Sequence, residues 1–195
     1  MVGIGITTRN RPDVLEFVIG QFNKYYSDEL KFVVIDDNSD DPDLNRRWAE
    51  QLGEYYYNEN RLGIAKSKNE CIKQLDTEHI LLFDDDCFPI KPRWWDPWIN
   101  ADHHMVYALR PLIGRKELKE KTIWWKGCLG CCLYFSRHAI DTLGGFDPRF
   151  KIAGFEHAEI TSRARRAGLI PHPYISPRDT GIWSFDASGD YDSFI

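Results

Sequence analysis

The sequence lacks several features that define common classes of protein. It has no apolar run of about 18 residues, so we expect no transmembrane span. Its N-terminus has neither the positive start nor the long apolar stretch of a secretory signal peptide. No G-x-x-x-x-G-K-[ST] segment is present, which argues against a P-loop enzyme. Gly3 and Gly5 lie inside an apolar strand pattern rather than after it, which argues against a dinucleotide-binding fingerprint.

The cysteine pattern favours neither disulfides nor zinc. The chain has five cysteines, an odd number, and all lie in apolar segments. Cys128 and Cys131 have the spacing of a zinc-binding pair, but no second Cys or His pair follows at zinc-site distance. We therefore expect buried free thiols and a reducing, cytoplasmic setting.

Charge is distributed unevenly along the 195 residues, whose net charge is −5. Residues 1–100 hold 12 Lys and Arg against 19 Asp and Glu, whereas residues 101–195 hold 13 against 11. This balance excludes a uniformly basic nucleic-acid binder and leaves a local basic face in the second half open. Seven Trp residues either pack in the core or form a surface that grips ring-shaped ligands.

Strand and helix patterns alternate in the first half of the chain. Apolar strand patterns cover residues 2–6, 31–35, 54–57 and 79–83. Helical spacing covers residues 12–22, 44–48 and 63–75, with Asn10 as the expected N-cap of the first helix. This alternation with short links predicts an α/β fold, a mostly parallel sheet flanked by helices on both faces.

Polar side chains follow the predicted strands and should meet at one edge of the sheet. They are Thr7-Thr8, Asp36-Asp37, Asn58 and Asp84-Asp85-Asp86. In such sheets ligands bind beyond the carboxyl ends of the strands. Because crowded carboxylates repel each other, we expect a cation or the polar edge of a ligand to compensate them.

The triplet Asp84-Asp85-Asp86 is the sharpest chemical feature of the sequence. Alternate side chains of a strand point the same way, so Asp84 and Asp86 can share one side while Asp85 faces the other. Hard oxygen ligands of this kind suit Mg²⁺ or Mn²⁺ bound jointly with a substrate phosphate. A solvated acidic turn is the alternative, and a phosphatase with an Asp nucleophile is conceivable. The position directly after a buried strand favours the metal.

Five segments in order resemble the GT-A glycosyltransferases, and most closely the family 2 enzymes that use nucleotide sugars. They are Ile6-Thr7-Thr8-Arg9-Asn10-Arg11-Pro12, the "DDxS"-like Val34-Ile35-Asp36-Asp37-Asn38-Ser39, the "N-x-G-x-x-x-A-x-N"-like stretch at 58–69, the "DxD"-like Phe83-Asp84-Asp85-Asp86, and the "GGFDxxF"-like residues 144–150. The resemblance covers about residues 2–170. It implies one GT-A domain with a nucleotide-sugar half (1–86), an acceptor-side half (87–174) and a possible lid or tail (175–195).

The resemblance also implies roles for residues of the first half. Thr7 and Asp37 would hold the nucleobase, with Thr8 and Arg9 beside them in the donor site. Lys68 lies near the same subsite and could meet the base or a phosphate. Asp85 would reach the ribose, and Asp86, with help from Asp84, would hold Mn²⁺ or Mg²⁺ on the diphosphate.

The sequence departs from the family pattern at Glu156-His157-Ala158-Glu159, where the family often has "EDxD". The second residue of "ED" usually deprotonates the acceptor, and an imidazole with a pKa of about 6.5 can serve as that base. Alternatively, His157 is a third metal ligand and Glu156 the base, or His157 has no chemical role. Glu159 shares a helix face with Glu156 and either positions His157, binds the acceptor or pairs with Arg163.

The second half is less regular, and its expected roles concern the acceptor. Trp124 and Trp125 precede an apolar strand at 128–135 and either stack on a sugar ring or pack in the core. Residues 115–121 form a charged stretch, expected as an exposed loop or lid. His172 lies between prolines and is a weaker candidate metal ligand.

Together these features predict a metal-dependent glycosyltransferase, inverting in mechanism. By resemblance it moves a sugar from a nucleotide-diphosphate sugar, foremost a UDP-sugar, to a hydroxyl of a glycan, a protein or a hydroxylated nucleobase. A nucleotidyltransferase of the same fold is one alternative, although it would normally carry a Gly-rich loop after the first strand and residues 7–12 contain no Gly. A non-catalytic nucleotide-sugar binder is the other.

Overall fold

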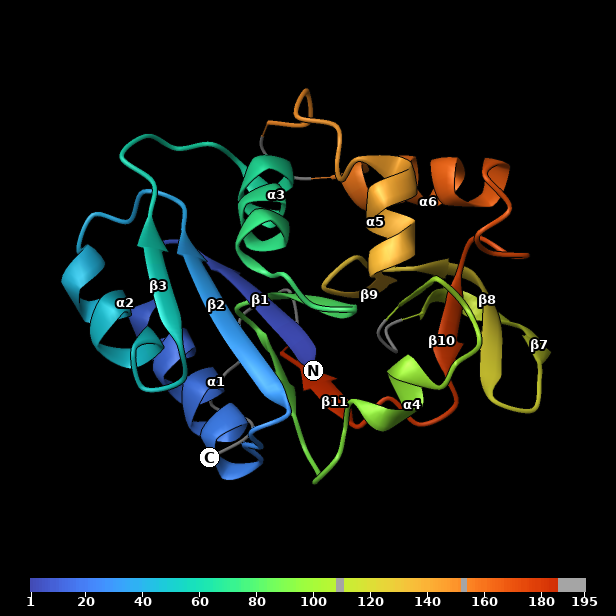
Figure 1. Cartoon of the computed structure of the whole chain (residues 1–195), viewed down its shortest axis with the longest axis horizontal. Coiled ribbons are helices and arrows are strands. Elements are labelled where there is room, and N and C mark those ends of the chain that lie inside the picture. Colours follow the sequence, from blue (N-terminus) through green and yellow to red (C-terminus); the bar gives the residue numbers. More distant parts are fainter. Residues whose placement is uncertain (108–110, 152–153, 186–195) are drawn as a thin grey trace.

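A six-stranded sheet with the order β3-β2-β1-β4-β9-β6 runs through the computed structural model, which describes residues 1–107, 111–151 and 154–185 (Figure 1). Four strands are parallel: β1 (Val2–Thr8), β2 (Leu30–Asp36), β3 (Glu54–Tyr57) and β4 (His79–Asp84). The strand β9 (Cys132–Ser136) runs antiparallel to β4 and to β6 (Met105–Tyr107). The predicted mostly parallel α/β sheet is thereby confirmed.

Helices cover the sheet on both faces (Figure 1). The helices α1 (Pro12–Lys24) and α2 (Pro42–Ala49) pack against each other, and α3 (Ile64–Gln74) packs on β1, β2 and β4. After β3 the chain crosses back over the sheet to β4, so a right-handed connection puts α3 on the face opposite α1 and α2. The remaining helices are α4 (Asp96–Ile99), α5 (Arg137–Leu143) and α6 (Glu156–Arg166).

The buried core follows the predicted apolar positions of the first half. Every residue of β1 is buried, and the inward face of α1 is formed by the predicted Leu15, Val18, Ile19 and Phe22. The predicted N-cap is wrong, since Arg11 and not Asn10 precedes α1. Asn10 has a positive φ of 54° and exchanges hydrogen bonds of 2.8 and 3.0 Å with Asp40, so it joins the loops that follow β1 and β2.

Two smaller sheets complete the second half of the fold. One pairs β10 (Ile175–Pro177), β8 (Thr122–Cys128) and β7 (Pro111–Leu118), and the other pairs β5 (Cys87–Pro89) with β11 (Ile182–Ser184). Residues 115–118 therefore belong to β7 and not to a loop or lid, and only residues 119–121 form an exposed turn, which leads into β8. The strand expected at 128–135 is divided between β8 and β9.

The expected lid or tail at 175–195 contributes strands to both small sheets. Residues 175–184 pair with β8 and β5, and Ile175 and Ile182 are buried. Residues 186–195 lie outside the described part of the chain. The segment 175–185 is thus an integral part of the fold in this structure.

Three of the seven tryptophans form a buried cluster that packs against α1 and β4. Trp94, Trp95 and Trp98 are at most 2% exposed, and the Trp94 ring packs edge-on against Phe22 and Phe83. The Trp98 Nε1–H donates a 2.7 Å hydrogen bond to the Thr180 carbonyl. This bond ties the segment before β11 to the core.

Two further observations concern the cysteines and the helices. All five cysteines are free thiols, four of them buried. Among the helices of the described residues, none combines the length and apolar character needed to cross a membrane.

The Trp98 bond predicts a measurable difference between two similar substitutions. Trp98→Phe leaves the Thr180 carbonyl unpaired, whereas Trp95→Phe removes an Nε1–H that has no hydrogen-bond partner among the described residues. We expect Trp98→Phe to lower the free energy of unfolding by about 1–2 kcal/mol more than Trp95→Phe does, measured by urea denaturation. Equal losses would show that the indole bond contributes nothing.

Candidate functional site

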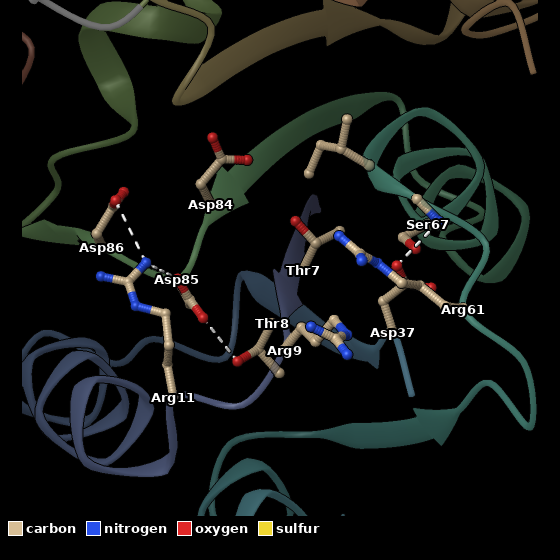
Figure 2. Close-up of a pocket in the computed structure, with 12 residues that line it drawn as sticks. Thr7, Thr8, Arg9, Arg11, Asp37, Arg61, Ser67, Asp84, Asp85 and Asp86 are labelled. Atoms are coloured by element: carbon tan, nitrogen blue, oxygen red, sulfur yellow. Dashed lines mark hydrogen bonds and ion pairs between the residues drawn. The ribbon is translucent and has the colours of Figure 1, made fainter. Parts of the chain in front are cut away.

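A cavity of about 270 Å³ lies at the carboxyl edge of the main sheet (Figure 2). It is bounded by the ends of β1, β2 and β4, the turn before α1, and the loop that leads into α3. Its walls are formed by Thr7, Thr8, Arg9, Arg11, Asp37, Arg61, Gly63, Ile64, Ser67, Asp84, Asp85 and Asp86. Seven residues predicted for the donor and the metal are therefore brought together, whereas Lys68 and the alternative metal ligands His157 and His172 do not line the cavity.

Cations of the chain itself compensate two carboxylates of the acidic triplet. Asp85 is buried, accepts a 2.7 Å hydrogen bond from the Thr8 hydroxyl, and lies 2.6 Å from Arg11 Nη1. The same nitrogen is 3.5 Å from Asp86 Oδ2. Burial raises the pKa of Asp85 to about 7, against the opposing effects of Arg11 and Thr8. In Figure 2 Asp85 points toward Thr8 and away from Asp84. The strand β4 ends at Asp84, and Asp85 and Asp86 both approach Arg11 Nη1, so the predicted alternation does not extend through the triplet.

The third carboxylate of the triplet belongs to a buried network around Lys68. The Lys68 side chain is about 1% exposed, and its Nζ lies 3.1 Å from Asp84 Oδ1 and 3.7 Å from Glu156 Oε1. It also donates a 3.2 Å hydrogen bond to the Gly130 carbonyl. Burial alone would lower the pKa of Lys68, but the two carboxylates outweigh it and raise the pKa. In this structure the Lys68 ammonium contacts Asp84, Glu156 and the Gly130 carbonyl. Its predicted contact with a base or phosphate stays a prediction.

Asp37 shapes the wall of the cavity through backbone contacts. Its Oδ1 accepts a 2.7 Å hydrogen bond from the Leu62 N–H, and its Oδ2 accepts one of 2.9 Å from the Gly63 N–H. Gly63 has a φ of 84°, and a Cβ there would lie 1.4 Å from the Lys151 carbonyl oxygen. Only glycine therefore fits this position. A carboxylate offers about four lone-pair sites, so Asp37 can still accept a bond from a ligand.

The sequence assigned no role to Ser67, and it placed Asp36 among the polar side chains at the ligand-binding edge. Ser67 is fully buried in the cavity wall, and its hydroxyl has no hydrogen-bond partner among the described residues. Asp36 is buried and accepts bonds from the Ser39 N–H, the Asn45 amide and the Tyr55 hydroxyl, so it braces β2. Asp36 therefore serves the loop after β2 and does not line the cavity, whereas Ser67 presents a hydroxyl without a partner among the described residues.

Glu156 and His157 begin α6 and do not line the cavity. Glu156 Oε1 lies 3.7 Å from His157 Nδ1 and from Lys68 Nζ, and the Gly154 N–H donates to its other oxygen at 3.1 Å. Burial would raise the pKa of Glu156, but His157 and Lys68 outweigh it and lower the pKa to about 2. So acidic a carboxyl group is a weak proton acceptor, which favours His157 over Glu156 as a base.

The His157 imidazole lies directly against the turn between β8 and β9. A Cβ on Gly130 would lie 2.6 Å from His157 Cγ, so the glycine allows the backbone to approach the ring. The His157 carbonyl accepts a 3.1 Å hydrogen bond from the Tyr107 hydroxyl. The first turn of α6 is thereby held against the main sheet.

The residues predicted for the acceptor make other contacts in this structure. Glu159 forms a bidentate ion pair with Arg163, at 2.7 and 2.8 Å, so the salt-bridge alternative describes its contacts. The Trp124 ring stacks on His172 at 5.1 Å, and Trp125 Nε1–H donates to Ser176 Oγ at 2.9 Å. A His172 ring nitrogen lies 2.7 Å from the Trp125 carbonyl. None of these side chains lines the cavity, and their predicted acceptor and metal roles stay predictions.

The donor set of the cavity fits a divalent cation that a ligand helps to hold. Within the described residues, no three His, Cys, Asp or Glu side chains form a group that could hold a metal ion. Asp84 and Asp86 both open onto the cavity, and Mg²⁺-type ions are commonly bound by one or two carboxylates together with substrate phosphates and water.

Solved glycosyltransferases share this architecture. The mannosyltransferase PcManGT of Pyrobaculum calidifontis, in complex with GDP-Man and Mn²⁺, matches with a TM-score of 0.69 at 20% identity, over 92% of this chain and 55% of its own. GalNAc-T7 with UDP, GalNAc and Mn²⁺ matches at 0.67 and 17% identity, over 82% of this chain and 39% of its own. S. aureus TarS in complex with UDP matches at 0.62 and 16% identity, over 83% and 54%. The fold is therefore GT-A, and this chain spans about half or less of each solved chain.

The sequence comparison narrows the class to a family. The family described as "Glycosyl transferase family 2" matches residues 4–126, more than half of the chain. An uncharacterized glycosyltransferase of Acanthamoeba polyphaga mimivirus is 26% identical over 190 residues, which cover 86% of this chain and 68% of the viral protein. The chain belongs to glycosyl transferase family 2, so its enzyme class is that of the glycosyltransferases, as the motifs predicted.

The Lys68 network predicts that replacing Lys68 lowers stability strongly and that a second substitution restores part of the loss. Lys68→Met leaves Asp84 and Glu156 without their shared cation, and we expect the free energy of unfolding to fall by about 3–5 kcal/mol. Adding Glu156→Gln removes one orphaned charge and should recover part of that loss. Urea denaturation of the single and double variants measures both effects. A double variant that is less stable than Lys68→Met would contradict the network.

Proposed function

We propose that this chain transfers a sugar from a nucleotide-diphosphate sugar, foremost a UDP-sugar, to an acceptor hydroxyl, with Mn²⁺ or Mg²⁺ and with inversion at the anomeric carbon. The observation that carries the proposal is that one cavity is lined both by Asp37, a hydrogen-bond acceptor, and by the carboxylates Asp84 and Asp86. A ligand with a polar base at one end and a diphosphate at the other suits this arrangement. Structural relatives with GDP-Man, UDP and Mn²⁺ support it.

Residues 1–86 would bind the donor in the following way. Asp37 accepts from a base N–H, and Thr7, Thr8 and Arg9 complete that end of the cavity. Asp85 lies where a ribose would follow, and Asp84 and Asp86 would hold the cation on the diphosphate. When bound, the cation stabilises the charge that develops on the leaving nucleoside diphosphate.

The transfer itself forms one bond and breaks another. The acceptor oxygen bonds to the anomeric carbon while the bond from that carbon to the diphosphate oxygen breaks, and His157 takes the acceptor proton. His157 suits this role because it is half-buried, lies beside Glu156, and opens the helix that adjoins the donor half. Residues 87–174 would then supply the acceptor side, with a glycan, a protein or a hydroxylated nucleobase as substrate. The five free thiols support a reducing, cytoplasmic setting.

The donor proposal is tested by thermal denaturation with UDP or GDP, in Mn²⁺ or in EDTA. A nucleoside diphosphate at about 100-fold its Kd with Mn²⁺ should raise Tm by about 5–10 °C, and EDTA should remove most of that shift. Asp86→Asn should abolish the metal-dependent part, whereas Asp141→Asn, an exposed carboxylate of α5, should keep it. If no nucleoside diphosphate stabilises the wild-type protein, the proposed donor site is wrong.

The catalytic proposal is tested by separating binding from transfer. His157→Ala should leave the Kd for the nucleoside diphosphate unchanged and lower kcat about 10²–10⁴-fold, because it removes the proton acceptor. His138→Ala, an exposed residue of α5, is the matched control and should change neither value. Lost metal affinity in His157→Ala would favour the ligand alternative instead. NMR of the product checks the predicted inversion, and a protein that binds donors without any turnover would be the non-catalytic binder.

A further inference from the structure

Arg11 holds the acidic triplet in this structure, in a place where a bound cation is also expected. Its Nη1 lies 2.6 Å from Asp85 Oδ1 and 3.5 Å from Asp86 Oδ2 (Figure 2). The two carboxylates differ in burial, since the Asp85 side chain is 6% exposed and that of Asp86 is 23% exposed. Asp85 has a second partner in the Thr8 hydroxyl, so the contact with Asp86 is the weaker and more accessible one.

The arginine has the freedom and the chemistry to change partners. Its side chain is 37% exposed, and the cavity lies beside it. A guanidinium presents five N–H donors in a planar fork, which matches phosphate oxygens as well as carboxylates. Arg11 can therefore keep its bond to Asp85 and still direct other N–H groups toward an anion in the cavity.

Other cationic groups of the cavity do not share this arrangement. Arg9 and Arg61 also line the cavity, yet neither forms an ion pair with a described residue. Lys68 is buried and pairs with Asp84 and Glu156, away from Asp86. Arg11 is thus the cation that competes directly with a metal ion for Asp86.

We propose that Arg11 is the counterion of Asp86 before the metal binds, and that it passes to the diphosphate of the donor when the metal takes this carboxylate. This inference rests on the proposed function. Two cations at one carboxylate repel each other, so Arg11 weakens the binding of metal alone. A diphosphate attracts both cations, so it removes that penalty. The arginine thereby makes metal and nucleotide bind cooperatively, which favours the loaded site over a site with metal only.

The test measures the binding of Mn²⁺ alone, of UDP in EDTA, and of UDP with Mn²⁺, by calorimetry on the full chain. Arg11→Met should bind Mn²⁺ alone about three- to fivefold more tightly than the wild type, because an ion pair with Asp86 is lost. It should bind UDP in EDTA more weakly, and UDP should improve its Mn²⁺ affinity less than in the wild type. Arg61→Met, which removes a cavity arginine without a carboxylate partner among the described residues, should leave the affinity for Mn²⁺ alone within about twofold.

The design allows for the buried charge that Arg11→Met leaves on Asp85. If that variant does not fold, Asp85→Asn/Arg11→Met is compared with Asp85→Asn, since the amide needs no counterion, and the same tightening of Mn²⁺ binding is expected. Unchanged or weaker Mn²⁺ binding in either comparison overturns the role of Arg11. A wild-type protein that binds neither Mn²⁺ nor UDP overturns the proposed function itself, and the two failures are therefore distinguishable.

Discussion

One buried ammonium group holds the two halves of this domain in register. Lys68 on α3 reaches the end of β4 through Asp84, the start of α6 through Glu156, and the turn between β8 and β9 through the Gly130 carbonyl. Removing a charge from water is costly unless good partners replace the solvent, so these three segments must sit where the ammonium needs them. The orientation of Asp84 in the cavity and the place of His157 beside Gly130 both depend on this group.

The need to compensate buried charge also affects the interpretation of the acidic residues at the end of β4. Several carboxylates at one edge require compensation, and a metal ion is the usual suggestion. Here Arg11 and Lys68 already supply two positive charges to the triplet. In addition, burial raises the pKa of Asp85 to about 7. The carboxylate count alone therefore does not establish a metal site. A more specific observation is that Asp84 and Asp86 line the same cavity as Asp37.

The sequence predicts the first half of the fold well because parallel strands buried on both faces leave continuous apolar runs. The same runs place Thr7, Asp37 and Asp84 at one edge without any knowledge of side-chain contacts. The second half depends on contacts between distant segments. The apolar stretch at 128–135 is divided because the backbone at Gly130 turns to meet His157 and Lys68. The glycine is a local signal for such a turn, but the residues that it meets lie far along the chain. Arg11 was missed for the same reason, since it gains its role only from Asp85 and Asp86, far along the chain.

The last strands of the fold have a consequence for its synthesis. The Phe185 N–H donates a 2.9 Å hydrogen bond to the Asp86 carbonyl, and β11 pairs with the strand that follows the acidic triplet. A nascent chain can thus form the parallel β1–β4 unit long before these partners leave the ribosome. Until residues 175–185 emerge, the edges of β5 and β8 lack a neighbour, and the loop bearing Asp86 lacks one of its backbone anchors. The domain would acquire its donor-side framework early and a fully braced acidic loop only after residues 175–185 have emerged.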